Sequence, residues 1–88
     1  MPSSELQLAV EALRALHKSS DAAAQFIEVI SAHGEVVILG NQEGLSWLAL
    51  QLAELALKNT EFAHLHLDAA GAADRADVPV VFRVSPAQ

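Results

Sequence analysis

A strand signal runs directly into a helix signal over residues 35–58, which read EVVILGNQEGLSWLALQLAELALK. Three β-branched residues in a row favour a strand at Glu35–Leu39, because such side chains pack well on a pleated surface. Asn41 is a good N-cap for the following helix, and Glu43 in the first turn complements the helix dipole. We therefore predict a strand at Glu35–Leu39 and a helix over residues 42–58.

The helix over residues 42–58 has one apolar side. At about 100° per residue, its apolar side chains share an arc that should pack on a sheet. The arc holds Leu45, Leu48, Ala49, Leu52, Leu55 and Ala56. Trp47 falls instead on the polar side with Glu54. Trp47 then either packs under the first helix or stands exposed as an aromatic anchor for a protein partner, since Trp is enriched at binding hot spots.

The residues before this strand predict a helix and a second strand. Residues 5–17 read as a helix with Ser4 and Gln7 as a capping box, and its apolar face carries Leu6, Ala9, Val10, Leu13 and Leu16. Residues 20–34 fit either a helix capped by Ser20 or a strand at residues 25–31 that forms a hairpin with Glu35–Leu39. A cluster of β-branched residues favours the hairpin.

Two further strands follow the long helix. Phe62–Asp68 and Val78–Ser85 alternate in hydrophobicity, which is typical of strands, and the Ala/Gly/Asp-rich residues 69–77 between them read as a mobile connection. The order α-β-β-α-β-β predicts an α+β fold in a single domain of residues 1–88. We expect a four-stranded, mainly antiparallel sheet with the helix over residues 42–58 packed on one face.

Strand alternation divides the side chains of this sheet between two faces. The face toward the helix should hold Ile27, Val29, Val36, Ile38, Ala63, Leu65, Leu67, Val80, Phe82 and Val84. The opposite face should hold Phe26, Glu28, Ile30, Val37, Leu39, Phe62, His64, His66, Asp68, Val81 and Arg83. More than half of this second set is apolar, and large apolar patches are unusual on a monomer. We expect the first helix, a second copy of the chain or a partner to cover it.

Composition excludes several classes of protein. The 88 residues include 11 Asp and Glu against 5 Lys and Arg, for a net charge of −6 and no Cys. The absence of Cys rules out disulfides and thiolate chemistry, and the acidic balance argues against coating nucleic acid. The first five residues lack the basic start of a signal peptide, and no uncharged apolar run approaches the roughly 18 residues of a membrane span. We expect a cytoplasmic protein that binds neither nucleic acid nor membrane.

The segment His64-Leu65-His66-Leu67-Asp68 is the one cluster with chemical possibilities. Two residues apart on a strand, both imidazoles point the same way and can ligate one metal ion, with Asp68 as a carboxylate ligand. The alternative is a pair of hydrogen-bonded histidines, with Asp68 or Glu28 as acceptor and Arg83 paired with an acid. No further ligand has a distinctive spacing, and we expect no metal or other cofactor.

Catalytic motifs are not visible in the sequence. There is no Gly-x-Ser-x-Gly nucleophile elbow. Residues 40–44 superficially suggest a glycine loop that binds phosphate at a helix N-terminus, but they lack the Gly-Lys-Ser/Thr ending of a P-loop, and Glu43 would repel a phosphate. We interpret residues 40–44 as a strand-to-helix turn and the chain as a non-enzyme.

The order of these segments resembles small bacterial immunity proteins of polymorphic-toxin and contact-dependent competition systems. The shared pattern is a strand ending Gly-Asn/Asp-x-Glu-Gly-Leu, here residues 40–45, then a helix, then a strand reading His-x-His-Leu/Phe-Asp, here residues 64–68. The resemblance covers residues 35–84 and leaves out residues 1–24. It implies a non-enzymatic protein that binds and blocks a toxin domain made by the same cell.

The acidic charge fits such a role, because it would steer the chain toward a basic toxin such as a nuclease. The contact residues predicted from exposure are Trp47, Glu54, His64, His66, Asp68 and Arg83. Two other functions stay open at this point: a homodimeric structural or regulatory α+β domain whose second sheet face is its own interface, and a metal-binding domain that depends on His64 and His66.

Overall fold

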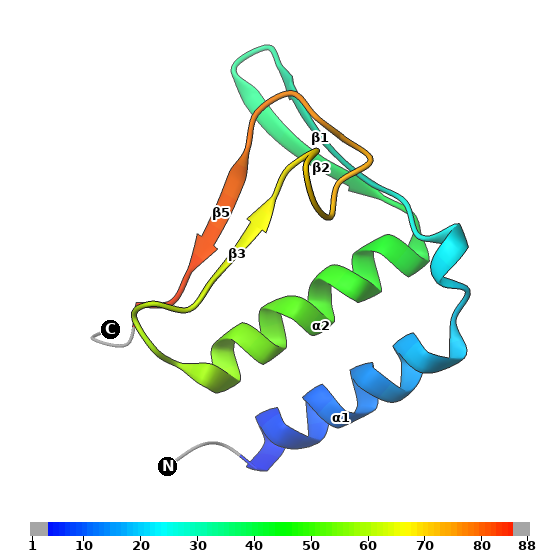
Figure 1. Ribbon diagram of the computed structural model, residues 1–88, viewed down its shortest axis with the longest axis vertical. Helices are drawn as coiled ribbons and strands as arrows, with labels where there is room; N and C mark the ends of the chain where they lie inside the picture. The colour runs from blue at the N-terminus through cyan, green and yellow to red at the C-terminus, as the bar shows by residue number, and fades with distance from the viewer. Residues whose placement is uncertain (1–3, 86–88) are drawn as a thin grey trace.

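The computed structural model describes residues 4–85, in which two long helices lie beside two small sheets (Figure 1). The elements in chain order are α1 (Ser4–Ser19), the 3-10 helix η1 (Ala22–Ala24), β1 (Ile27–Ala32), β2 (Glu35–Gly40), α2 (Gln42–Lys58), β3 (His64–Leu67), β4 (Arg75–Ala76) and β5 (Val80–Arg83). The α+β class, both predicted helices and the β1–β2 hairpin are confirmed. Neither helix in this described part has the length and apolarity of a membrane span.

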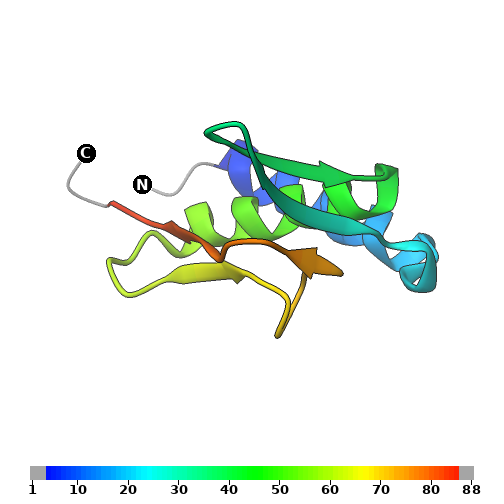
Figure 2. The same ribbon diagram turned by 90° about the horizontal axis from the view of Figure 1, so that it is seen from above.

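The single four-stranded sheet predicted from the sequence is wrong. One sheet has three strands in the order β2-β1-β4, and the other has the two strands β3 and β5. β1 pairs antiparallel with β2 and parallel with β4, while β3 pairs antiparallel with β5. The reason is that β4 occupies the edge of β1 that a continuous sheet would need. Figure 2 shows the hairpin on one side and β3 and β5 on the other.

The hairpin turn is tight because two consecutive residues adopt left-handed backbone conformations. His33 has φ 54° and Gly34 has φ 79°, and Ala32 pairs with Glu35 across the turn. Two positive φ angles match the twist of a two-residue hairpin. This geometry fixes the register of β1 against β2 without a bulge.

The segment before β5 is an ordered part of the sheet, so the prediction of a mobile connection at residues 69–77 is wrong. The backbone N–H groups of Asp74 and Asp77 donate to the carbonyls of Ile27 and Val29 at 2.8 and 2.9 Å. Their carboxylates accept from the backbone N–H groups of Ile27 and Ser31, each at 2.9 Å. The two aspartates therefore complete the second edge of β1, where β4 alone is too short to do so.

The position of Asp77 lowers its pKa. The backbone N–H of Ser31 donates to its carboxylate, and the Arg75 guanidinium lies 3.1 Å away. These groups, the Ser31 hydrogen bond first, hold the pKa of Asp77 below its usual value by stabilising the charged form.

Asn41 joins β2, α2 and the segment before β1. Its side-chain oxygen accepts from the backbone N–H groups of Gly44 at 2.8 Å and Phe26 at 3.0 Å. Its amide donates to the Ala24 carbonyl, and its backbone N–H donates to the Phe26 carbonyl. Gly44 is required here, because a Cβ on this residue would lie 1.9 Å from the Phe26 oxygen. The interpretation of residues 40–44 as a strand-to-helix turn is confirmed.

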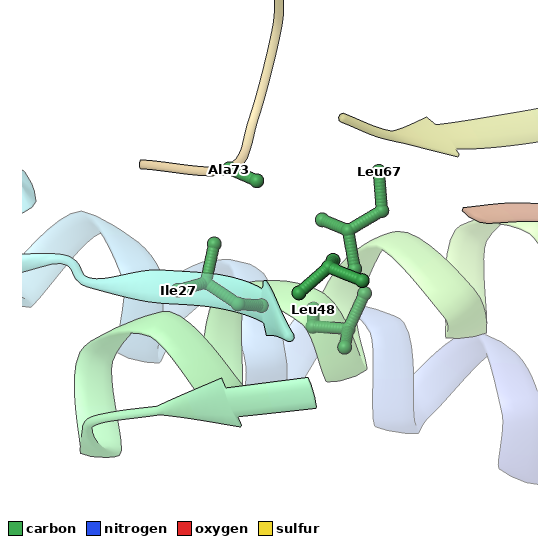
Figure 3. Close-up of a cluster of buried hydrophobic side chains, with 5 residues drawn as sticks. Ile27, Leu48, Leu67 and Ala73 are labelled. Carbon is green, nitrogen blue, oxygen red and sulfur yellow. The ribbon is translucent and has the colours of Figure 1, made fainter. Parts of the chain in front are cut away.

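The main core lies between α2 and the two sheets (Figure 3). Its buried side chains are Ile27, Val29, Leu48, Leu67 and Ala73. Partly buried residues pack against them, and these are Ile38, Trp47, Leu52, Leu65, Ala72, Ala76, Val78, Val80 and Phe82. Most of the predicted inward face is therefore confirmed. Val36 is an exception at 54% exposed, because the hairpin tip projects beyond the helices (Figure 1).

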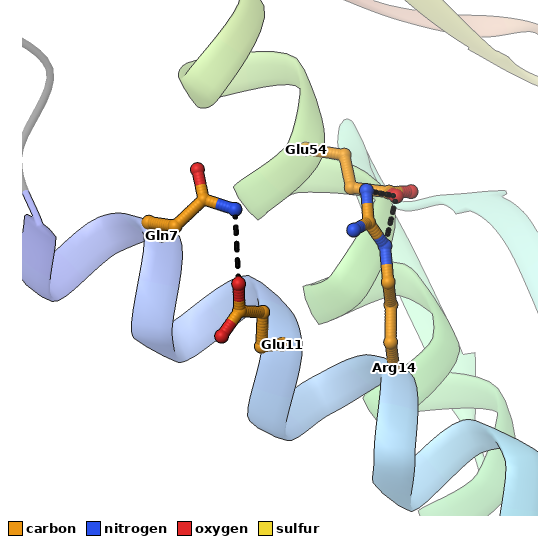
Figure 4. Close-up of polar contacts among 4 residues, drawn as sticks. All are labelled: Gln7, Glu11, Arg14 and Glu54. Atoms are coloured by element: carbon orange, nitrogen blue, oxygen red, sulfur yellow. Dashed lines mark hydrogen bonds and ion pairs between the residues drawn. The ribbon is translucent and has the colours of Figure 1, made fainter.

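The long helix α2 is covered on two sides, which changes which of its residues are buried. Leu48 and Leu55 of the predicted apolar arc are buried, but Leu45 is 45% exposed. Leu50, outside the arc, is only 4% exposed. It lies one turn before Glu54, which forms an ion pair with Arg14 of α1 (Figure 4). The side of α2 that carries Leu50 therefore faces α1.

The first helix does not cover the second sheet face. α1 lies on the far side of α2 from the strands (Figure 1). Val10 is fully buried and Leu13 is half-buried, whereas Ala9 and Leu16 of the predicted apolar face are exposed. The outer sides of both sheets are thus left uncovered by the described part of the chain.

Candidate functional site

The outer side of β3 and β5 carries the residues that the sequence placed on the second face. His64, His66, Val81 and Arg83 are exposed, while Leu65, Leu67, Val80 and Phe82 alternate with them toward the core. We call the exposed set the β3–β5 face. The strand alternation predicted for this region is confirmed.

Cross-strand register brings the polar members of this face together. His64 lies opposite Arg83, and His66 lies opposite Val81. The two imidazole rings are edge to face with centroids 4.8 Å apart. His64 Nδ1 lies 2.9 Å from the Phe62 carbonyl oxygen, which can only accept, so this nitrogen carries a proton. The face therefore presents two adjacent imidazoles beside one guanidinium.

A groove of about 300 Å³ borders the His64 side of the face. It is lined by Arg14, Gln51, Glu54, Leu55, Leu57, Lys58, His64 and Leu65. Within it the Nε and a terminal nitrogen of Arg14 donate to one oxygen of Glu54 at 3.0 and 2.8 Å (Figure 4). Gln7 donates a separate hydrogen bond to Glu11 within α1, apart from the Arg14–Glu54 pair (Figure 4). The lining of the groove thus combines leucine side chains with charged ones, a composition suited to receiving a partner side chain.

A second groove of about 350 Å³ borders the Arg83 side. Its lining is more apolar and consists of Leu52, Leu55, Ala56, Asn59, Phe82, Arg83 and Val84. His64 and Arg83, which face each other across the two strands, therefore each border one groove along the C-terminal half of α2. We call the face and its two grooves together the candidate binding surface.

The structure brings four of the six predicted contact residues to this surface. His64, His66 and Arg83 lie on the β3–β5 face, and Glu54 lines the groove beside His64. Trp47 is half-buried against the main core, away from the groove. Asp68 begins a turn in which its carbonyl accepts from Gly71 and Ala73.

The histidines do not assemble with a third ligand. Among residues 4–85, no group of three His, Asp or Glu side chains is arranged to hold a metal ion, so Asp68 does not join His64 and His66. The ion pairs of this part of the chain are Arg14–Glu54 and Arg75–Asp77. Neither includes Arg83, so the predicted pairing of Arg83 with an acid is wrong.

Sequence reasoning missed part of the groove. Arg14 is 40 residues from its partner Glu54, and no local signal links them. Gln51 and Lys58 share the polar side of α2 with Glu54, and their spacing of three to four residues was the available signal.

The described part of this acidic α+β chain carries an exposed candidate surface on β3, β5 and α2. The family model described as Immunity protein 32 matches residues 35–83, which is more than half of the chain and contains α2, β3 and β5. The chain belongs to the Immunity protein 32 family. No curated protein and no solved structure matches it.

Family membership confirms the resemblance at the level of an immunity protein. It indicates a toxin-neutralising binding protein, a toxin as protein partner, and a role without catalysis.

Proposed function

We propose that this chain acts in the cytoplasm by binding and blocking the toxin domain of a polymorphic-toxin or contact-dependent competition system made by the same cell. The observation that carries the proposal is the family match over residues 35–83. The open surface formed by β3, β5 and α2 supports it, because this surface lies within the matched region. Blocking needs only occupation of the toxin, so no catalytic residue is required.

The contact residues in this proposal are His64, His66 and Arg83, with Glu54 in the adjoining groove. Arginine supplies a planar group that stacks and donates several hydrogen bonds, which is why it is frequent at hot spots. Trp47 and Asp68 act indirectly: Trp47 packs against the core, and Asp68 shapes the turn that follows β3.

Charge acts on two scales in this binding. The net charge of −6 attracts a basic toxin, such as a nuclease, over a distance of about a Debye length. The local β3–β5 face carries a guanidinium and two imidazoles, so it binds acceptor groups and aromatic rings of the toxin at short range. Long-range charge governs association rates, and close contacts govern dissociation rates.

The test is a kinetic binding measurement with the toxin domain encoded beside this chain's gene. His64→Ala and Arg83→Ala should each weaken binding by about tenfold or more, mainly through faster dissociation. Val37→Thr, on the outer side of the hairpin, is the matched control and should leave binding unchanged. Association should slow as salt rises.

Two results would contradict the proposal in different ways. Failure of the folded chain to bind the toxin would reject the function. Tight binding that the His64→Ala/Arg83→Ala double variant leaves intact would reject the β3–β5 face as the binding site while keeping the function.

A further inference from the structure

The free edge of β2 exposes backbone hydrogen-bonding groups. β2 lies at one end of the order β2-β1-β4, and within residues 4–85 no strand pairs with its other side. The Asn41 N–H donates to the Phe26 carbonyl. In an antiparallel ladder hydrogen-bonded pairs then recur at every second position, so Leu39, Val37 and Glu35 point their backbone groups at β1. Val36, Ile38 and Gly40 therefore point theirs outward.

This edge lacks the features that normally keep edge strands apart. Natural edges are short or carry charged residues, prolines or bulges. β2 spans six residues, pairs with β1 without a bulge, and has no charge or proline between Val36 and Gly40. Its side chains are exposed as well, at 54% for Val36, 42% for Val37 and 48% for Leu39.

The other edge strands in residues 4–85 are shorter than β2. β4 has two residues, and β3 and β5 have four each; β5 also follows Pro79 and carries Arg83. Among these edges β2 is the longest and the most suitable for pairing with another strand.

We propose that β2 pairs antiparallel with β2 of a second copy of this chain, about a two-fold axis at Ile38. The two Ile38 residues then lie opposite each other, and Val36 lies opposite Gly40 of the second copy. These pairs exchange about six N–H···O bonds. Two three-stranded sheets become one continuous six-stranded sheet.

The sequence of β2 is self-complementary in this register. Val37 faces Leu39 of the second copy, so apolar side chains meet across the axis. The terminal Glu35 falls opposite Asn41, so no like charges oppose each other. An axis moved by two residues in either direction would pair Val36 or Gly40 with itself and leave the other two outward residues without a partner on β2. Ile38 is therefore the centre that uses all three outward residues.

Dimerisation through β2 rests on different residues from the proposed toxin binding, so either proposal can fail without the other. The hairpin and the strands β3 and β5 lie on opposite sides of the molecule in Figure 2, so pairing through β2 leaves β3 and β5 of each copy available. The interface is uncharged although each copy carries −6. Added salt screens the repulsion between copies, so it tightens the dimer, whereas it weakens steering to a basic toxin.

The first test measures mass by light scattering up to about 0.5 mM chain. The wild type should move from 9.3 kDa toward twice that mass as concentration rises, and it should do so at lower concentration in about 500 mM salt than in about 50 mM. The Val36 N–H points away from β1, so Val36→Pro removes an outward hydrogen-bond donor without breaking a bond to β1. Proline is tolerated at such a free edge. It should weaken dimerisation by about tenfold or more.

Val36→Thr is the matched control, because it keeps the β-branched shape and the outward N–H. It should dimerise within about threefold of the wild type. Equal urea midpoints for the wild type and both variants, followed through the fluorescence of Trp47, establish that the substitutions leave the fold intact.

A second test uses the absence of cysteine from the chain. Directly opposed hydrogen-bonded residues have Cα atoms about 5.5 Å apart, inside the range that a disulfide spans. Ile38→Cys should therefore form a disulfide-linked dimer on mild oxidation much faster than Val81→Cys, whose position is on β5.

The proposal is overturned if the wild type stays at 9.3 kDa throughout and Ile38→Cys is oxidised to dimer no faster than Val81→Cys. It is equally overturned if the wild type is monomeric while Val36→Pro weakens toxin binding, because a strand of the toxin would then occupy the edge.

Discussion

Replacing Gly44 with alanine is the sharpest perturbation of this fold. The new Cβ would lie 1.9 Å from the Phe26 oxygen and 2.7 Å from the Phe26 carbonyl carbon. Real Cβ atoms essentially never approach closer than 3.0 Å, so the two backbone segments must separate by about 1.1 Å. The obstructing atoms belong to the backbone and have no alternative rotamer to adopt.

The separation also disturbs the hydrogen bonds that meet at Asn41. The Phe26 carbonyl accepts from the Asn41 N–H at 3.2 Å, and the Phe26 N–H donates to the Asn41 side chain at 3.0 Å. Overpacking against rigid atoms costs about 3 kcal/mol, and loss of the cap costs about 1–2 kcal/mol. The higher helix propensity of alanine offsets about 1 kcal/mol. The net expected loss is about 3–4 kcal/mol, a large share of the stability of a small domain.

Urea unfolding followed by Trp47 fluorescence measures this loss, since Trp47 is the one tryptophan and packs against the core. With a slope of about 1 kcal/mol per molar urea, the midpoint should fall by about 3 M. Gly71→Ala is the control, because its Cβ would meet only the Asp68 carboxylate at an ordinary 3.6 Å. A Gly44→Ala variant as stable as Gly71→Ala would refute the close contact between α2 and Phe26.

Three further outcomes are expected. Asp74→Ala removes the acceptor of the fully buried Ile27 N–H and should lower the free energy of unfolding by about 1–3 kcal/mol in urea; no loss would contradict the role of Asp74 at the β1 edge. Because the folded chain holds the pKa of Asp77 low, its stabilisation is present above about pH 4 and is lost as pH falls through the lowered pKa. Unfolding followed from pH 5 to 3 should therefore be less pH-dependent in Asp77→Asn, and parallel profiles would count against this. Arg14→Ala breaks a partly exposed pair with Glu54 and should cost less than about 1 kcal/mol; a larger thermal destabilisation would mean that this pair holds α1 in place.

Local periodicity predicted the two long helices, the β1–β2 hairpin, strands β3 and β5, and much of the core. The alternation of side chains along a strand predicted that Leu65 and Leu67 point inward and that His64 and His66 point outward. The prediction holds because only one face of β3 is covered. Asn41 indicated the start of α2, because asparagine is a favoured N-cap residue. Both features depend only on near neighbours in the sequence, so they could be read from it.

The division into two sheets could not be predicted in this way. β4 has two residues and lacks a hydrophobic run, and what holds the segment is a pair of carboxylates, Asp74 and Asp77, bonded to β1 about 46 residues earlier. Aspartate is also common in loops, so its presence favoured a mobile connection. Nothing nearby in the chain identifies the partner of either carboxylate.

The candidate site shows the same limit. Alternation gave the exposure of His64 and Arg83, but their position opposite each other follows from the register of β3 against β5. Trp47 was placed on the polar side of α2 because the helical pattern assumes one covered side. Here α1 and the sheets cover α2 from two sides, so the polar side is partly buried.

Neutralisation in living cells tests the central claim most directly. Bacteria that express the neighbouring toxin domain should survive when the wild-type chain is co-expressed, and they should lose most of that protection with the His64→Ala/Arg83→Ala double variant at equal folded protein level. Death of the cells despite abundant folded wild-type chain would contradict the account.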